Sequence, residues 1–525
     1  MKTPPDWITV RRRACMEIGA GARGNKGPPA TQEGTDYEDD SRGSEDRPDP
    51  RLGRGVGYLS GMLKLKGHRT ALIFDPMIKD KSEEFAARVK IINPDLIGFS
   101  VVTENYQWAL NMAAVFKQNF ATPIIFGGPH VTIMPQEVIS NPQVDMVAVG
   151  ESEKSLLELA DSGLNRQDIK GIWFKQNGSV IRNSLRPLEP DIDQYPFPDE
   201  DLFYEQLPPS YRITPSVITS RGCPFSCTYC GNQIMQKVYR ESGSASWVRR
   251  RSVENVLAEL AWRKERHGSR HFVFMDDIFA SDLEWLRRFI KEYKQKINLP
   301  FNCLAHPSLA KEETIALLKE GGCTFVDFGL QSGCSDIRKK VLYRYEKNEE
   351  VLAIAEVCKK HKLRFILDCI LNLPFDTEET IKESLGLFNK ARPDIVSCYS
   401  LAYLPRAQIM GISKGAGLLS EEDIGLIEEG RHPLRLSSVV RKHGKDDYRR
   451  YSFLFCSLPI LPKWSVSMIV RSRLLFSLFT SMPLIFLALP RVIAKFKFGF
   501  RPVSRNLISN GIFYFKNYLF RRKKI

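Results

Sequence analysis

The sequence predicts an α/β protein with two successive αβ units and a helical tail, and three observations support this. Short apolar runs alternate with amphipathic patterns over 53–164, which is typical of a doubly wound, Rossmann-like domain. A second αβ series over 212–410 offers six strands, too few for an eight-stranded barrel, and predicts a partial (β/α)6 barrel. Residues 411–525 follow and end in a strongly basic segment, and we expect them to form an α-helical extension.

The N-terminal segment, residues 1–52, has a different composition from the rest of the chain. It is rich in Gly, Pro, Asp, Glu and Arg and has almost no apolar periodicity, so we expect it to be disordered or non-native. No apolar strand is recognisable before the helical pattern of RLGRGVGYLSGMLK (51–64). We therefore expect the first strand of the doubly wound sheet to be missing.

The remaining strands of this first unit are expected at 70–75, 95–100, 123–128 and 145–150. Ligands of such sheets bind at the carboxyl ends of the strands, where glycines let the backbone approach closely. The candidate binding residues at those ends are Ser100, Thr103, Asn105, Gly127, Gly128, Pro129, His130, Gly150 and Glu151. The alternative interpretation is that these residues only form tight turns, and that His130 caps the next helix.

A connector is expected between the two units, over 165–211. GIWFKQNGSVIRN (171–183) has two short apolar runs around Asn177–Gly178, which predicts a hairpin. Several prolines follow it and favour an extended linker.

The strands of the second unit are expected at 216–220, 271–277, 301–306, 324–333, 365–374 and 395–405. Helix signals separate them, including Ser252 as a cap before 253–265 and Gly321 after 312–320. Asp376, with Glu379 three residues on, has the capping-box pattern.

Three cysteines, Cys223, Cys227 and Cys230, follow the first of these strands in SRGCPFSCTYCGNQ. Three thiolates cannot complete a four-coordinate structural zinc site without a further ligand, and no Cys or His pair lies nearby in the sequence. An iron–sulfur cubane is held by thiolates one iron at a time, so three cysteines leave one iron open to a substrate or cosubstrate. A zinc site or a chance spacing remains the alternative.

The other cysteines lie in apolar runs and are interpreted as small hydrophobes, as in a reducing cytoplasm. His306, at the end of an expected strand, is interpreted as a packing or supporting residue rather than a catalytic base.

The CxxxCxxC motif, with Tyr229 before its last cysteine, resembles that of the radical S-adenosylmethionine (SAM) enzymes. The resemblance implies a 4Fe–4S cluster held by the three cysteines, with SAM chelated to the open iron. It also implies one-electron cleavage of SAM to a 5′-deoxyadenosyl radical, and an electron donor such as a flavodoxin or ferredoxin.

Further segments resemble the SAM-contacting strand ends of that family. FMDDIF (274–279) implies contacts from Asp276 and Asp277, and FGLQSG (328–333) implies contacts from Gln331 and Ser332. LNLPFDTEET (371–380) and LPRA (404–407) occupy the places of two further segments but depart from the usual residues.

The whole of 53–405 resembles the cobalamin-dependent radical SAM family, in which a cobalamin-binding domain precedes the barrel. GGPH (127–130) carries the resemblance in the first unit, although no Asp-x-His-x-x-Gly motif is present. The implied function is methylation of an unactivated carbon of a small-molecule or lipid-like substrate, and no residue is assigned to catalysis. The alternatives are a cobalamin-assisted rearrangement or cyclisation, a cobalamin-free radical SAM enzyme, or an inactive cluster-binding membrane scaffold.

The formal charge of +15 is concentrated in the tail, because Lys463 onward contains thirteen Lys or Arg and no Asp or Glu. A nucleic-acid partner is therefore not expected. Residues 474–489 carry no charge but are too short for a spanning helix, and basic residues flank them. We expect a cytoplasmic protein with peripheral contact to the inner membrane face through 463–525; the alternative is a helical cap on the barrel.

Overall fold

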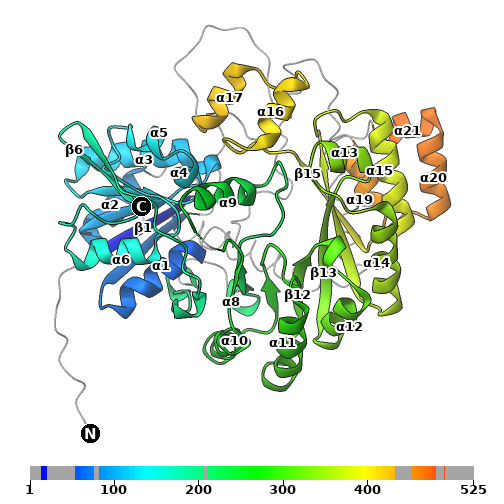
Figure 1. Cartoon of the computed structure of the whole chain (residues 1–525), viewed down its shortest axis with the longest axis horizontal. Coiled ribbons are helices and arrows are strands. Elements are labelled where there is room, and N and C mark those ends of the chain that lie inside the picture. Colours follow the sequence, from blue (N-terminus) through cyan, green and yellow to red (C-terminus); the bar gives the residue numbers. More distant parts are fainter. Residues whose placement is uncertain are drawn as a thin grey trace, which may run out of the picture. The chain divides into compact units, whose positions relative to one another are not determined.

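The structure, a computed structural model, describes residues 13–19, 54–75, 82–204, 210–244, 246–431, 451–480, 490 and 493. The chain forms two compact units. The first contains Met1–Arg23, Pro48–Pro187 and Tyr195–Glu205, and the second contains Gly24–Arg47, Leu188–Gln194 and Gln206–Ile525. Each unit has its own sheet and its own hydrophobic core (Figure 1).

The first unit is a doubly wound sheet in the order β2-β1-β3-β4-β5-β6-β7. Strands β1 to β5 are parallel, and this order is one of the two common arrangements of nucleotide- and cofactor-binding sheets. The strands are β1 Arg13–Gly19, β2 Arg69–Asp75, β3 Leu96–Ser100, β4 Ile124–Gly127, β5 Met146–Ala148, β6 Ile172–Gln176 and β7 Ser179–Arg182. The principal helices are α1 Arg54–Leu65, α2 Ser82–Ile92, α3 Tyr106–Asn119, α4 Pro129–Ile133, α5 Pro135–Ile139 and α6 Glu153–Asp161.

Strand β1 corrects the expectation that the first strand is missing. It lies inside the sheet, paired with β2 from Arg13↔Arg69 to Gly19↔Asp75 and with β3 on its other side. A strand buried in a parallel sheet is usually a continuous apolar run, whereas RACMEIG is interrupted by Glu17 and preceded by arginines. Residues 20–53 separate it from α1, far more than the usual two to six residues of a βα connection. The strand is therefore difficult to recognise from the sequence.

The predicted hairpin is confirmed, but it belongs to the first unit rather than to a separate linker. Asn177 and Gly178 form its turn with φ of 49° and 78°, and β6 pairs antiparallel with β5. Residues further on also pack in this unit, since Lys64 Nζ lies 2.6 Å from Asp199 Oδ2. The expected linker is thus divided between the two units.

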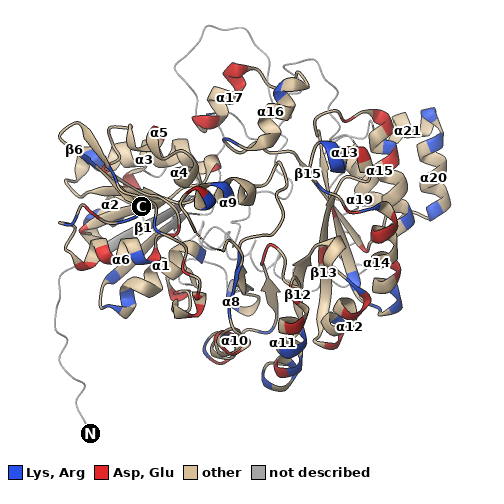
Figure 2. Ribbon diagram, in the orientation of Figure 1, with Lys and Arg blue, Asp and Glu red and all other residues tan. Residues whose placement is uncertain are grey.

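The second unit contains a parallel six-stranded sheet in the order β15-β14-β13-β12-β11-β8, which confirms the partial barrel. Its strands are β8 Ser216–Val217, β11 Phe272–Phe274, β12 Phe301–Ala305, β13 Cys323–Gln331, β14 Arg364–Leu371 and β15 Ile395–Ser400. A short antiparallel pair, β9 Ser220–Arg221 and β10 Arg249–Arg250, lies beside it in sequence. The helices are α8 Ser210–Ile213, α9 Gly231–Glu241, α10 Val253–His267, α11 Leu283–Lys296, α12 Glu312–Glu320, α13 Ser335–Lys340, α14 Asn348–Lys360 and α15 Glu378–Ala391. Acidic and basic residues are interspersed along the helices α11, α12 and α14 (Figure 2).

The helix signals are mostly as expected. Ser252 Oγ accepts a hydrogen bond from Asn255 N at 3.1 Å and caps α10. Helix α15, in contrast, is capped by Thr377, whose Oγ1 accepts from Thr380 N at 3.3 Å, and not by Asp376. Asp376 instead accepts from Leu373 N at 2.9 Å, which fixes the turn before the helix.

The tail begins with α16 Gln408–Gly415 and α17 Glu421–Glu428 and continues with α19 Ser452–Ser457, α20 Lys463–Arg471 and α21 Arg473–Thr480. Part of it packs on the barrel: Phe455 on α19 is buried and lies edge to face with Phe388 on α15, with ring centroids 5.4 Å apart. In the part of the chain that the structure describes, no helix is both long and apolar enough to cross a bilayer. Most of the uncharged run 474–489 lies outside the described residues.

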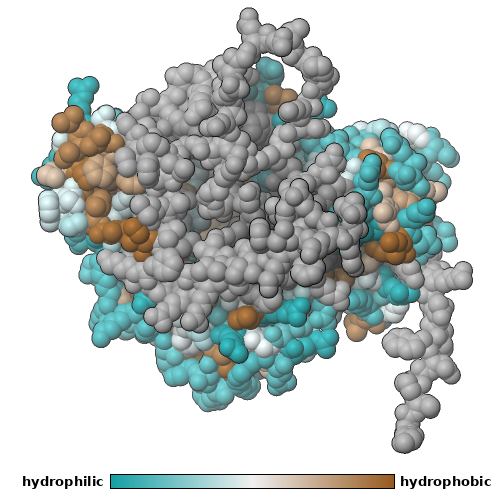
Figure 3. All heavy atoms as spheres, turned by 180° about the vertical axis from the view of Figure 1, so that it is seen from behind, coloured by the Kyte–Doolittle hydropathy of each residue, from teal (hydrophilic) through white to brown (hydrophobic). Residues whose placement is uncertain are grey.

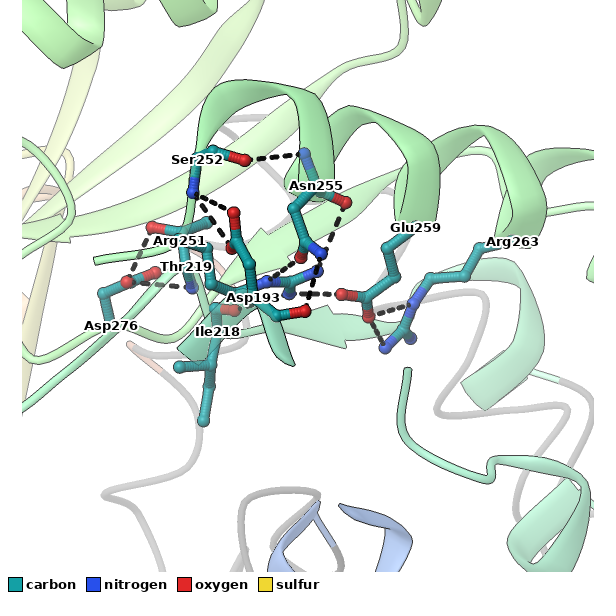
Figure 4. A network of polar contacts seen from close by, with 9 residues as sticks. All are labelled: Asp193, Ile218, Thr219, Arg251, Ser252, Asn255, Glu259, Arg263 and Asp276. Carbon is teal, nitrogen blue, oxygen red and sulfur yellow. Dashed lines mark hydrogen bonds and ion pairs between the residues drawn. The ribbon is translucent and has the colours of Figure 1, made fainter. Parts of the chain in front are cut away.

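A buried charge network holds α10 against the start of the barrel (Figure 4). Glu259 is 1% exposed and pairs with Arg251 on one side and with Arg263 on the other, where Arg263 Nε donates at 2.8 Å. Arg251 Nη1 also donates to the carbonyl of Ile218 at 3.0 Å, just after β8. Burial alone would raise the pKa of Glu259, but the two arginines hold it below its ordinary value.

We expect Glu259→Gln to lower the free energy of unfolding of the second unit by about 3–5 kcal/mol, because it leaves two buried arginines without their counter-charge. Urea unfolding followed by tryptophan fluorescence measures this. The matched control is Glu313→Gln, which breaks an exposed ion pair with Arg287 in the same unit and should cost at most about 1 kcal/mol. Equal losses in the two variants would contradict the prediction.

Candidate functional site

The cysteine loop runs from Gly222 to Cys230, between β9 and α9. Gly222 has φ +86°, and a Cβ there would lie 2.4 Å from the carbonyl oxygen of Trp247, so only glycine fits the start of the loop. Cys227 is buried, and Cys223 and Cys230 are partly exposed; all three are free thiols. The loop therefore brings the three predicted ligands together on one short segment.

Residues from much later in the chain pin this loop in place. Thr228 Oγ1 donates to the carbonyl of Val341 at 2.6 Å, and its backbone N donates to Leu342 O at 3.3 Å. Arg344 Nη1 donates to Cys227 Sγ at 3.6 Å. The sequence does not point to Arg344 as a site residue. The pattern that hints at its burial is the alternation of Leu342, Arg344 and Glu346 with the exposed Tyr343 and Tyr345.

The loop also packs on the end of β12. The ring of Phe225 stacks on His306, with centroids 4.0 Å apart and planes 16° from parallel. His306 is 6% exposed and its Nε2 lies 2.9 Å from Arg344 Nη2. This geometry agrees with the supporting role expected for His306.

The thiols are held in a setting that disfavours their charged form. Burial raises the pKa of Cys223 to about 12 and also raises the pKa of Cys230. Without a metal, the thiols of Cys223 and Cys230 are therefore protonated at neutral pH, and metal binding has to displace their protons.

These residues fit an iron–sulfur cubane. Three cysteines on one loop can each bind a different iron, which leaves the fourth iron for another ligand. Among the residues with described positions, no three His, Cys, Asp or Glu side chains converge as they would around a single metal ion.

Two of the predicted SAM-contacting residues lie at the end of β11. Asp276 Oδ1 accepts from Thr219 N at 3.0 Å, from Thr219 Oγ1 at 2.7 Å and from Ser220 Oγ at 2.6 Å, so it ties β11 to the strand before the cysteine loop (Figure 4). Its Oδ2 atom is buried and has no hydrogen-bond partner among the described residues. Asp277 follows and is exposed.

Two others lie at the end of β13. Gln331 is partly buried and has φ +72°, and Ser332 is buried with its Oγ 3.2 Å from the backbone N of Cys334. The next residue, Gly333, has no room for a side chain, since a Cβ would lie 2.4 Å from Ser384 Cα on α15. The Ser332 side chain is therefore engaged in the turn itself.

The strand ends that follow are also strained. Asn372 and Phe375 after β14 have φ of 63° and 64°, and Arg406 after β15 has φ of 60°. Positive φ in residues other than glycine costs about 1–3 kcal/mol each and clusters at functional sites. These three residues lie in the segments where the sequence departs from the usual SAM-binding residues.

In the first unit, side chains link the loops after β3, β4 and β5. Thr103 Oγ1 lies 3.2 Å from His130 Nδ1, which joins the first two loops. Thr132 Oγ1 accepts from Gly150 N at 2.9 Å, which joins the second and third. Hydrogen bonds therefore link the three loops that carry the predicted residues of this edge.

Several of the predicted residues at this edge also stabilise the local backbone. Gly128 has φ +106°, and a Cβ would lie 2.6 Å from the carbonyl oxygen of Val101. Asn105 Nδ2 donates to Ser100 O at 3.2 Å and thereby fixes its own loop. Pro129 occupies the first turn of α4, where its missing N–H is harmless. Gly127, Gly150 and Glu151 remain partly exposed at the edge.

His130 is the residue at this edge that points to a ligand. It is 1% exposed and packs on the ring of Tyr106, with centroids 4.2 Å apart. Burial lowers the pKa of His130 to about 4, so its ring is neutral, and Nε2 is buried with no hydrogen-bond partner among the described residues. A buried polar atom of this kind costs about 1–3 kcal/mol unless a ligand pairs with it. The edge therefore fits a large polar cofactor such as cobalamin.

Profiles of two protein families match this chain. That of the B12 binding domain matches residues 53–160, and that of the radical SAM superfamily matches residues 217–388. Both matches fall within the units described above.

Individual proteins are also similar to this chain over most of both units. An uncharacterized methyltransferase of Pyrococcus horikoshii is 27% identical over 347 residues, which cover 64% of this chain and 72% of the relative. The anaerobic magnesium-protoporphyrin IX monomethyl ester cyclase of Rubrivivax gelatinosus is 23% identical, covering 65% of this chain and 62% of the relative. The solved structure of the radical SAM methyltransferase TsrM of Kitasatospora setae, with tryptophan and a SAM analogue, superposes with a TM-score of 0.58 at 16% identity and covers 75% of this chain and 74% of its own.

The cofactors of the chain are therefore a 4Fe–4S cluster, SAM and cobalamin. With a B12-binding domain followed by a radical SAM domain, the chain belongs to the cobalamin-dependent radical SAM enzymes.

Proposed function

We propose that the protein methylates an unactivated carbon of a small, lipid-like molecule in the cytoplasm. The family membership carries the proposal, together with relatives that are methyltransferases. The electron would come from a flavodoxin or ferredoxin, the class of donor that low-potential clusters require.

The cluster supplies the electron that cleaves SAM, and cobalamin carries the methyl group. The residues of the chain itself would bind the cofactors and orient them. Cys223, Cys227 and Cys230 would hold the cluster, and the ends of β11 and β13 would position SAM beside it. His130 Nε2 would donate to or accept from the cobalamin periphery at the edge of the first unit.

Exposed aromatic side chains favour an apolar substrate. Tyr399 near the end of β15 is 55% exposed, and Phe375 in the loop after β14 is 58% exposed. These strands are neighbours in the sheet, with Ile370 opposite Tyr399. Active sites of such barrels lie at the carboxyl ends of their strands, so the two rings are available to contact substrate.

A cyclisation without methyl transfer is the second candidate, because one relative is an anaerobic ester cyclase. The products separate the two reactions: methyl transfer leaves S-adenosylhomocysteine as well as 5′-deoxyadenosine, whereas cyclisation forms no S-adenosylhomocysteine. The cobalamin-free alternative depended on a missing first strand, and β1 removes that argument.

Anaerobic reconstitution with iron, sulfide and hydroxocobalamin tests the cofactor set. We expect about four irons and one cobalt per chain, and 5′-deoxyadenosine after dithionite and SAM are added. Cys227→Ala should lose the cluster and SAM cleavage but keep cobalamin. Cys358→Ala, a buried cysteine on α14, is the matched control and should keep both. A wild-type chain that binds zinc instead of iron would refute the proposal.

We expect His130→Ala to raise the Kd for hydroxocobalamin about tenfold, because the change removes a polar contact worth about 1–3 kcal/mol. Titration followed by the cobalamin absorption spectrum measures this. His271→Ala is the control: His271 is equally buried and neutral but lies in the second unit. Binding by His130→Ala that matches wild type would remove the assigned contact.

We also propose that α20 and α21 contact anionic lipid. Trp464 and Met468 on α20 are 68% and 48% exposed, and Leu474 and Leu478 on α21 are 80% and 61% exposed. Apolar residues gather where these helices lie, at the left of Figure 3. The segment from Lys463 has only basic charges, each worth about 1 kcal/mol near an anionic surface.

The holoenzyme should therefore sediment with vesicles that contain phosphatidylserine and not with neutral vesicles. The double change Trp464→Ala and Leu474→Ala should lower the vesicle–water partition coefficient at least tenfold. Burial of each of these side chains in the membrane interface is worth about 1.5–3 kcal/mol of binding free energy. The double change Leu65→Ala and Ile91→Ala removes two exposed apolar side chains of the first unit and should have no effect. Equal binding by all three proteins would contradict membrane contact through these helices.

A further inference from the structure

Arg344 is a buried cation held in a single orientation beside a cluster ligand. Its side chain is 6% exposed, and its Nη1 donates to Cys227 Sγ at 3.6 Å. Its Nε donates to Glu346 Oε1 at 2.8 Å, and its Nη2 donates to the carbonyl of Gly329 on β13. A guanidinium fixed by this many partners presents the same N–H to the sulfur without reorganisation.

Two neighbours of Arg344 bear on the positive charge here: the buried cation Arg338, whose carbonyl accepts from Arg344 N at 2.8 Å, and His306. Guanidinium can only donate hydrogen bonds, so His306 Nε2 accepts from Arg344 Nη2, while Nδ1 lies 2.7 Å from Ser308 Oγ and 3.3 Å from Ser308 N. Burial and the nearby guanidinium lower the pKa of His306 to about 3, which keeps the ring neutral. The charge that contacts Cys227 directly is therefore that of Arg344, paired with Glu346, and Arg338 is a further cation nearby.

We propose that Arg344 is a positioning residue that sets the reduction potential of the cluster through its hydrogen bond and charge at Cys227, with Glu346 opposing it. A cubane held by three thiolates carries more negative charge after reduction. A fixed cation at a ligand sulfur stabilises the reduced form and raises the potential, and hydrogen bonds to cluster sulfurs act in the same direction. The inference rests on the proposed function, because it requires the cluster.

The proposal predicts opposite shifts of the reduction potential for changes at Arg344 and at Glu346. Arg344→Met removes the donor and the cation, so the potential should fall. Glu346→Gln keeps an oxygen for Arg344 Nε but removes the opposing negative charge, so the potential should rise. A residue that only supports the fold would shift both variants in the same direction or in neither.

The test is a redox titration of reconstituted holoenzyme, with the reduced cluster followed by its electron paramagnetic resonance signal. For each variant we expect a shift of at least tenfold in the one-electron equilibrium, or 59 mV, downward for Arg344→Met and upward for Glu346→Gln. Arg263→Met is the matched control, because Arg263 is also buried against a glutamate but lies on α10. The cluster of this variant should have the same reduction potential as that of the wild type.

Unchanged potentials, or shifts in the same direction, would overturn the proposal. If Arg344→Met does not fold, Glu346→Gln decides alone, since a potential that fails to rise is sufficient to reject it. A wild-type protein that forms a cluster and yields both 5′-deoxyadenosine and S-adenosylhomocysteine from SAM upholds the proposed function whatever the variants show. A wild-type protein without a cluster overturns both.

Discussion

In both units the parallel strands leave their carboxyl ends at one edge of the sheet, and most candidate site residues outside the cysteine loop lie at such an edge. The constraint brings loops together that are far apart in sequence. In the first unit it joins the loops after β3, β4 and β5 through Thr103, His130 and Thr132. In the second it places Asp276 and Gln331 at the ends of β11 and β13, and the hydrogen bonds of Asp276 to Thr219 and Ser220 tie the start of the cysteine loop to this edge.

Parallel alignment alone does not hold a loop of three thiols. The cysteine loop is fixed by long-range contacts with 341–346, and these are mostly polar and buried. Such contacts are costly to desolvate and favourable only when every partner is in place. The same logic applies to Glu259 between its two arginines, which secures α10 behind the loop. In the second unit, buried ion pairs and hydrogen bonds thus hold the short cysteine loop, which lies between Gly222 and Gly231.

The sequence predicts those features that repeat along the chain. Apolar runs at regular spacing predicted all six barrel strands, and the local spacing of Cys223, Cys227 and Cys230 indicated the cluster. It could not predict β1, because Glu17 and the arginines before it hide a buried strand. It could not predict Arg344 either, since a side-chain contact across more than a hundred residues leaves no local pattern. The capping of α15 by Thr377 rather than Asp376 shows that two adjacent capping residues cannot be ranked from spacing alone.

The central place of β1 has a consequence for biosynthesis. The strand is made before both of its neighbours, β2 and β3, and residues 20–53 and α1 separate it from them in the chain. Until then β1 has no partner, and once β2 and β3 are made they can pair only across it. A chain that begins after β1 would leave two facing unpaired edges in the interior of the sheet, and such edges template aggregation. Loss of β1 would therefore expose two strand edges of the first unit even though the barrel and its three cysteines remained intact.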